Sequence, residues 1–293
     1  MLGKYAIISP VRDEEQYIER TLRSVINQTY RPVEWVIVDD GSSDRTVKIV
    51  QRAAAEHPWI KLVQRHDRGQ RQPGQGVVEA FNYGRERLSC GPVDFICKMD
   101  GDLEFGSYYF ETLLMDFMRI PGLGMASGNT YIYNNENELV QEKAASGFVV
   151  GPIKLYRMKC FEEIGGLEPH LGWDTIDNYK ARMHGWETRS YSDLRVIHLR
   201  PMGTAKGIVW GKMRTGRGDY YTGTHPLFEI VRSLYRMGDY PFVLNGLSIG
   251  LGYLQAMLRG EQRIADPEFI RFIRQDQLKR LKRMVMPWRR ALA

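Results

Sequence analysis

The chain has 293 residues, a net charge of +6 and 26% charged side chains, the composition of one large folded domain or of one domain with an appendage. Its three cysteines are too few and too scattered for a disulfide framework, and none has the C-x-x-C spacing of a zinc site. The chain enters a strand-like run at Tyr5 without the basic and long apolar regions of a signal peptide. We therefore expect a cytoplasmic protein.

The first half alternates short apolar runs with amphipathic runs, which is the pattern of βα units on a mostly parallel sheet. In chain order it predicts strands at 5–9, 35–38, 60–63 and 93–99, and helices at 14–26, 45–56 and 75–88. Asp39 and Asp40 end the second strand, and a D-x-D motif at 100–102 follows the fourth. Ligands of open α/β sheets bind at the carboxyl ends of strands, so we expect both acidic pairs at one binding site.

The D-x-D motif consists of Asp100, Gly101 and Asp102. Mg²⁺ and Mn²⁺ prefer oxygen ligands, and Mg²⁺ is usually held by one or two carboxylates while phosphates and waters fill the remaining positions. The glycine would let a phosphate approach the backbone closely. A plain Asp-Gly turn is the alternative interpretation. Lys98, two residues earlier, either faces a phosphate or lies exposed at the sheet edge.

The second half contains more glycine and fewer strand patterns, with the clearest late strand at 194–199. We expect a mobile basic loop at 200–223 and mainly helix from residue 225 onward. Residues 241–258 carry no charged side chain and predict a buried or interfacial helix, with membrane insertion as the alternative. At 271–290 eight cations stand against one acid, and this basic amphipathic tail suits an anionic membrane surface.

Three ordered segments resemble the nucleotide-binding start of family 2 glycosyltransferases with the GT-A fold: 7–14, 22–30 and 36–46. The D-x-D follows them in the proper order. The resemblance implies an α/β fold with a Rossmann-like, mostly parallel sheet flanked by helices and a C-terminal helical extension. The implied domains are a catalytic domain at 1–224, made of a nucleotide-sugar half (1–102) and an acceptor half (103–224), and a basic helical extension at 225–293.

The resemblance also implies roles for single residues of the donor site. Asp102 would be the direct metal ligand, Asp100 would contact ribose or a metal-bound water, and Asp40 would contact the base of a UDP donor. The other donor-site candidates by resemblance are Ser9, Pro10, Asp13, Glu14, Asp39 and Gly101. Where many relatives have a lysine this chain has Val77, so Arg68 or Arg71 would supply the phosphate-facing cation. His198, at the end of the late strand, is either a third metal ligand or a structural histidine.

Sugar transfer needs a general base within hydrogen-bond reach of the acceptor hydroxyl. Residues 165–186 resemble the acceptor motif of the family, and the alignment of that motif makes Asp174 the catalytic base. Asp177, one helical turn later, is the second candidate, and a helix N-terminal cap is the alternative for either aspartate. Trp173 stands where relatives have a glutamate, and it would stack on an acceptor sugar or simply be buried.

These features favour an inverting glycosyltransferase that moves a sugar from a nucleotide-diphosphate donor to a hydroxyl of a glycan or polyprenyl-linked acceptor, with Mn²⁺ or Mg²⁺. A UDP-sugar is the favoured donor, and a GDP- or dTDP-sugar stays open. The chain lacks the Q-x-x-R-W sequence of processive synthases, which favours single additions. We expect a cytoplasmic location, peripheral on the inner face of the membrane, and leave a homodimer open.

Two other classes of protein share some of these features. A sugar-phosphate nucleotidyltransferase would need a G-x-G-T loop after the first strand, and residues 10–15 contain no such loop. A basic nucleic-acid-binding protein would explain only the tail, because the acidic strand ends would repel a phosphate backbone. We therefore expect no nucleic-acid partner.

Overall fold

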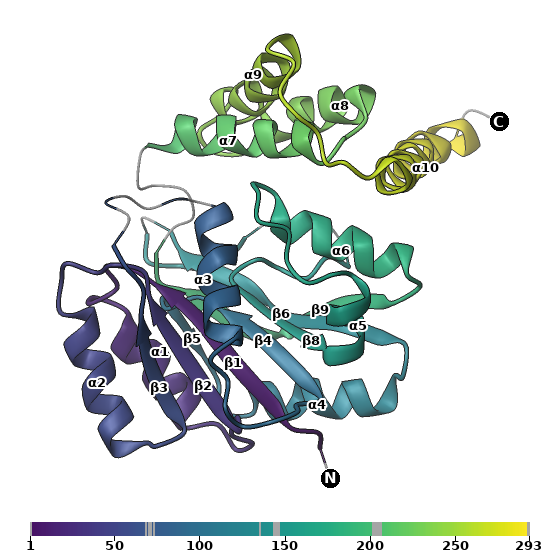
Figure 1. Ribbon diagram of the computed structural model, residues 1–293. Coiled ribbons are helices and arrows are strands. Elements are labelled where there is room, and N and C mark those ends of the chain that lie inside the picture. Colours follow the sequence, from purple (N-terminus) through teal and green to yellow (C-terminus); the bar gives the residue numbers. More distant parts are fainter. Residues whose placement is uncertain are drawn as a thin grey trace. The chain divides into compact units, whose positions relative to one another are not determined.

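The computed structural model describes residues 2–67, 69, 72, 74–134, 136–142, 147–200 and 207–291. The chain divides into two compact units (Figure 1). Residues 1–169 and 173–201 form an α/β unit, and residues 170–172 and 202–293 form a helical unit. The functional division predicted from the sequence, with a catalytic domain ending at residue 224, remains a prediction.

The α/β unit is built on one sheet with the strand order β3-β2-β1-β4-β8-β6-β9-β5, and β7 pairs with β6. Its strands are β1 (Tyr5–Val11), β2 (Glu34–Asp39), β3 (Ile60–Gln64), β4 (Phe95–Met99), β5 (Leu103–Phe105), β6 (Leu123–Tyr133), β7 (Leu139–Gln141), β8 (Ile153–Arg157) and β9 (Glu187–His198). The first four strands in the order are parallel, as expected. Because β8 is antiparallel to both β4 and β6, the sheet as a whole is mixed.

Helices cover both faces of this sheet (Figure 1). They are α1 (Ile18–Ile26), α2 (Thr46–Glu56), α3 (Gln75–Arg85), α4 (Tyr109–Arg119), α5 (Met158–Glu163) and α6 (Trp173–Met183). Ile7 belongs to the core under α1, α2 and α4, and its neighbour Ile8 belongs to the core under α3, α5 and α6. Successive strand side chains point to opposite faces, which is why a strand buried on both faces is apolar throughout.

The helical unit contains α7 (Ile208–Tyr221), α8 (Pro226–Arg236), α9 (Leu244–Leu258) and α10 (Pro267–Ala291). The expectation of a loop at 200–223 is therefore wrong for 208–221. The glycines there serve close packing, since a Cβ on Gly216 would lie 1.9 Å from the carbonyl oxygen of Ile249 in α9. Residues 201–206 of the expected loop lie outside the described residues. Among the described helices, none has the length and apolar character needed to cross a membrane.

Candidate active site

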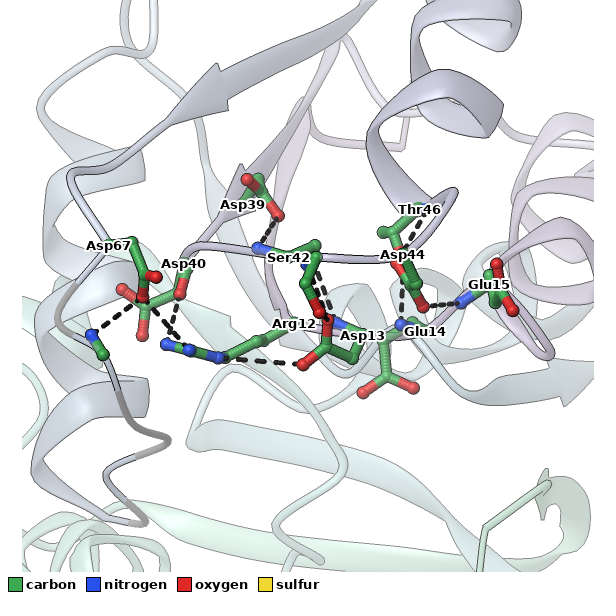
Figure 2. A network of polar contacts seen from close by, with 12 residues as sticks. Arg12, Asp13, Glu14, Glu15, Asp39, Asp40, Ser42, Asp44, Thr46 and Asp67 are labelled. Atoms are coloured by element: carbon green, nitrogen blue, oxygen red, sulfur yellow. Dashed lines mark hydrogen bonds and ion pairs between the residues drawn. The ribbon is translucent and has the colours of Figure 1, made fainter.

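Two loops at the carboxyl ends of β1 and β2 are joined by reciprocal hydrogen bonds (Figure 2). The amide of Asp13 donates to Ser42 Oγ at 3.0 Å, and the Asp13 carboxylate accepts from the amide of Ser43 at 2.8 Å. The amide of Glu14 donates to Thr46 Oγ1 at 2.8 Å. Asp13 has φ 54°, a left-handed conformation that is uncommon outside glycine. These bonds hold the acidic turn after β2 against the turn after β1.

The aspartate pair at the end of β2 is largely buried in this network. Asp39 Oδ1 accepts from the amide of Ser42 at 3.1 Å, so part of its role is to close the turn. Asp40 Oδ1 pairs with Arg65 at 3.0 Å, and its carbonyl oxygen accepts from Arg12 at 2.9 Å. Arg12 also pairs with Asp67 at 3.1 Å. Figure 2 shows Asp40 and Asp67 together on the Arg12 side of the network.

The D-x-D follows β4, with Asp102 as its buried member. Asp102 Oδ2 lies 3.6 Å from His198 Nε2 and 3.8 Å from Arg200 Nε. His198 Nδ1 in turn lies 3.3 Å from Glu142 Oε2, and Arg200 pairs with Glu14. Side chains from the first loop, the D-x-D and the end of β9 therefore converge on Asp102.

The charges of this cluster are mutually stabilised. Burial disfavours the charged form of Asp102, but the hydrogen bond and charge of His198 and the charge of Arg200 hold its pKa below the usual range. Burial likewise disfavours the imidazolium of His198, but hydrogen bonds to Asp102 and Glu142 raise its pKa to about 10. His198 is therefore a cation at neutral pH in this arrangement, and it would have to lose a proton to bind a metal.

The donor set of the cluster fits a divalent cation. Asp102 Oδ1 is buried and has no hydrogen-bond partner, which is costly for an ionised carboxylate unless a cation takes that position. Within the described part of the chain, no three His, Cys, Asp or Glu side chains are arranged to hold a metal by themselves. Mg²⁺ is commonly held by one or two carboxylates with substrate phosphates completing its shell, and that mode suits Asp102 with Asp100 beside it.

Lys98 connects the D-x-D to Asp174. The residue is 1% exposed, and its ammonium donates to Asp100 Oδ1 at 2.5 Å and to the carbonyl oxygen of Gly151 at 3.0 Å. Gly151 lies against Asp174, because a Cβ on it would stand 2.9 Å from Asp174 Oδ2. The expected exposure at the sheet edge is therefore wrong for Lys98, and the phosphate contact remains a prediction. The side chain instead bridges the two halves of the site.

A second buried lysine holds the helix that carries Asp174. Lys154 of β8 donates to Asp177 Oδ1 at 2.7 Å and to the carbonyl oxygen of Asp174 at 2.6 Å. Asp177 also accepts from Tyr156 Oη at 2.5 Å and is 1% exposed. This position leaves it no contact with an acceptor, so Asp177 fixes α6 in place. Asp174 is half-buried at the start of the same helix.

Other candidates from the sequence lie in different surroundings. Ser9 is fully buried and accepts from Trp35 Nε1 at 2.9 Å, so it does not line the site. A Cβ on Gly101 would stand 2.7 Å from Val11 Cγ1, so the glycine is needed for packing under the motif.

Trp173, the acceptor candidate, is buried, with Lys98 Nζ 5.0 Å and Lys154 Nζ 5.2 Å from its ring. Pro10 is half-buried near the end of β1, and Arg68 and Arg71 lie outside the described residues.

Sequence reasoning did not single out Lys154 and Glu142. A lysine within the apolar run 153–156 was the available signal for Lys154, since a charge inside a buried strand needs a partner. Glu142 follows β7 and meets His198 at a separation of 56 residues. No local pattern indicates such a contact.

Comparison with known proteins assigns the family. The model of glycosyl transferase family 2 matches residues 6–167, more than half of the chain. The chain belongs to this family. The family match covers the first loop, Asp39, Asp40 and the D-x-D, and the resemblance inferred from those motifs is confirmed.

Two bacterial proteins are among the curated relatives of this family 2 glycosyltransferase. Glycosyltransferase GlyA of Streptococcus pneumoniae is 30% identical over 204 residues, covering 61% of this chain and 28% of the relative. Poly-β-1,6-N-acetyl-D-glucosamine synthase of Staphylococcus aureus is 28% identical over 243 residues, covering 75% of this chain and 56% of the relative. The chain thus spans about half or less of the length of these relatives.

Solved glycosyltransferases share the fold. A mannosyltransferase from Pyrobaculum calidifontis, in complex with GDP-mannose and Mn²⁺, matches with a TM-score of 0.57 at 17% identity and covers 99% of this chain and 83% of its own. TarS of Staphylococcus aureus in complex with UDP-GlcNAc matches with a TM-score of 0.55 at 15% identity, covering 92% and 78%. The GT-A fold predicted from the sequence is thereby confirmed, with a mixed sheet.

Proposed function

We propose that this family 2 glycosyltransferase is an inverting enzyme that transfers a sugar from a nucleotide-diphosphate donor to a hydroxyl of a glycan or lipid-linked acceptor. The observation that carries the proposal is a D-x-D motif in which Asp102 has an unpartnered buried oxygen, while Lys98 joins Asp100 to Gly151, against which Asp174 lies. A UDP-sugar is the favoured donor, supported by TarS in complex with UDP-GlcNAc. The mannosyltransferase complex keeps a GDP-sugar open.

The donor side is formed by the acidic ends of β2 and β4. Asp40, held by Arg65 and Arg12, would accept hydrogen bonds from the base, with Asp39 and Asp13 shaping the same turn. Asp102, with Asp100 beside it, would hold Mn²⁺ or Mg²⁺, which supplies Lewis-acid stabilisation of charge on the departing diphosphate. Arg200, next to Asp102 and Glu14, adds a positive charge beside that position.

The acceptor side is formed by the start of α6. The Asp174 carboxylate would take the proton of the acceptor hydroxyl as its oxygen bonds to the anomeric carbon and the bond from that carbon to the diphosphate oxygen breaks. The products are an inverted glycoside, a nucleoside diphosphate and protonated Asp174. Lys154 anchors the main chain of Asp174, so its carboxylate starts from a fixed position. In keeping with the missing Q-x-x-R-W sequence, we propose single additions.

A transfer assay tests the base assignment. Purified protein is screened with UDP-, GDP- and dTDP-sugars with and without Mn²⁺, and hydrolysis or transfer is measured for wild type and Asp174→Asn. We expect Asp174→Asn to lower kcat about 10²- to 10⁴-fold with little change in donor affinity. Asp193→Asn, an exposed aspartate of β9, is the matched control and should keep full activity. Full activity of Asp174→Asn would overturn the assignment.

The basic tail fits an acceptor that lies at a membrane. Six of its cations on α10 have described side chains: Arg271, Arg274, Lys279, Arg280, Lys282 and Arg283. The helix is anchored in the helical unit by Phe269 and Ile273, which are fully buried, so its cations can contact anionic lipid without loss of the fold. A peripheral location on the inner membrane face is part of this proposal.

A further inference from the structure

Helix α9 directs its large apolar side chains toward solvent. Five leucines at spacings of three and four residues are exposed along it, and we call them the leucine face: Leu244, Leu247, Leu251, Leu254 and Leu258. Such spacing places side chains on one face of a helix. The last of them, Leu258, is 76% exposed. Leu251, Leu254 and Leu258 also line a shallow hollow of about 300 Å³.

The opposite, buried face of α9 is made mostly of small and polar residues, with Ile249 and Tyr253 as its two large members. Its buried members are Asn245, Gly246, Ser248, Ile249, Gly252, Tyr253 and Ala256. A Cβ on Gly246 would lie 1.9 Å from the carbonyl oxygen of Ser233 in α8, and one on Gly252 would lie 2.1 Å from that of Met213 in α7. A surface helix in water buries its apolar stripe, whereas helices packed in lipid meet through small residues and turn large apolar ones outward. Helix α9 follows the second pattern.

Further large apolar side chains of the helical unit are exposed outside the leucine face. Helix α8, which packs on α9, exposes Leu227, Ile230 and Leu234 at spacings of three and four residues. Between the two helices, Tyr240 and Phe242 are 74% and 69% exposed. Exposed apolar side chains gathered on neighbouring helices indicate an interaction site, and tyrosine is enriched at the boundary of a membrane.

The charge of the helical unit indicates which kind of partner binds this exposed apolar surface. Residues 202–293 contain sixteen Lys and Arg and seven Asp and Glu, a formal charge of +9. Two copies of such a unit repel each other, while an anionic surface attracts it. The charge is therefore complementary to an anionic lipid bilayer and opposes pairing of two leucine faces.

We propose that the leucine face of α9, together with the exposed apolar side chains of α8, docks the protein on an anionic lipid bilayer at the boundary between headgroups and acyl chains. The surface is distinct from the basic α10, whose cations would add electrostatic attraction. The inference needs no part of the transfer reaction, so it stands or falls independently of the assignment of Asp102 and Asp174.

Vesicle co-sedimentation tests the docking surface. The full chain is mixed with phosphatidylcholine vesicles that contain or lack phosphatidylglycerol, and the bound fraction is measured for wild type and for Leu247→Ser/Leu251→Ser/Leu254→Ser. The matched control is Met115→Ser/Met118→Ser, which alters two exposed apolar residues of α4. Leu258→Ser is a second test variant that removes the most exposed leucine, with little effect on packing. Circular dichroism establishes that each variant is folded.

We expect wild type and the α4 control to bind anionic vesicles, and the triple variant to lose at least about tenfold in partition coefficient. Leu258→Ser should lose a smaller part in the same direction. Unchanged binding of both leucine variants would overturn the inference and leave α10 as the membrane contact. Light scattering after gel filtration is run in parallel. A wild-type dimer that the triple variant converts to monomer, without vesicle binding, would show that a second copy covers the face and would also overturn it.

Discussion

Lys98 and Lys154 are directly opposite each other on the antiparallel strands β4 and β8. Like charges in that position are unfavourable, and each lysine is buried. Burial lowers the pKa of Lys154, which the charge of Asp177 partly offsets. Each ammonium therefore depends on its own carboxylate: Asp100 for Lys98 and Asp177 for Lys154. Together the two lysines keep Asp100, on the donor side, close to Asp174, on the side of the general base.

Removal of Lys154 should mainly affect stability. In Lys154→Met the Asp177 carboxylate would stay buried without its cation, which costs about 3–5 kcal/mol of unfolding free energy. Adding Asp177→Asn removes the unpaired charge and should recover more than half of that loss. Urea denaturation of the single and double variants measures both quantities. A loss in Lys154→Met below about 1 kcal/mol would mean that the ion pair is not needed.

Removal of Lys98 should mainly affect catalysis. Its partner Asp100 has a side chain that is 31% exposed, so water can replace the ammonium at a modest cost in stability. Without Lys98, the positions of Asp100 and Gly151 would be less well defined. Mutation of residues that orient a metal-binding side chain in this way typically lowers activity about 10- to 100-fold. We therefore expect Lys98→Met to lower kcat by that factor in the transfer assay while remaining folded. A large loss of stability with unchanged kcat would contradict this role.

At the scale of the element, α8 carries a buried acid next to another acid. Burial and the neighbouring charge of Asp219 raise the pKa of Glu229 to about 8, although Arg232 lies 3.6 Å away and acts in the opposite direction. The folded state thus retains a proton that the unfolded state releases near pH 4.5. This contribution to stability is complete below that pH and is lost as the pH rises through about 8.

Thermal unfolding across this pH window tests the Glu229 environment. Glu229→Gln, which cannot ionise, should flatten the decline in melting temperature between pH 4.5 and 8. The exposed Glu268→Gln on α10 is the control and should leave the decline as in wild type. An equal decline in Glu229→Gln would show that Glu229 is ionised throughout.

Elements with local signals could be predicted from the sequence, and elements whose signal depends on a distant partner could not. Strands β1, β2 and β4 are apolar runs that end in turn residues, so their positions follow from their own residues. Helix α7 has three glycines that indicate a loop when read locally. The reason for them lies in α9, which packs so closely against α7 that a larger residue would clash with its backbone.

The residues of the site likewise differ in whether a local sequence signal or a distant partner determines their position. Asp40 and Asp102 could be predicted because strand ends at one sheet edge are brought together by the fold class itself. The neighbours that set the charge state of Asp102, above all Glu142 acting through His198, come from a different part of the sheet. Asp177 has the helical spacing of an acceptor contact, yet Lys154 of β8 binds it in the core. Burial of that kind depends on tertiary packing.

At the scale of the whole molecule, the two units have opposite charge. The α/β unit contains 25 Lys and Arg and 28 Asp and Glu, and the helical unit supplies the positive excess. Solved glycosyltransferases with 14–17% identity share the fold, which shows that a GT-A sheet accommodates many sequences. Donor recognition belongs to the first unit in our account, and membrane contact belongs to the second.

Calorimetric titration of UDP into the protein, with and without Mn²⁺, tests whether Asp102 holds a metal ion against the diphosphate. Wild type and the control Asp193→Asn should bind UDP at least about tenfold more tightly with Mn²⁺, because the cation links the diphosphate to Asp102. Asp102→Asn should lose this metal-dependent gain and keep weak binding through the base. Equal strengthening of UDP binding by Mn²⁺ in Asp102→Asn and in wild type would contradict this role of Asp102.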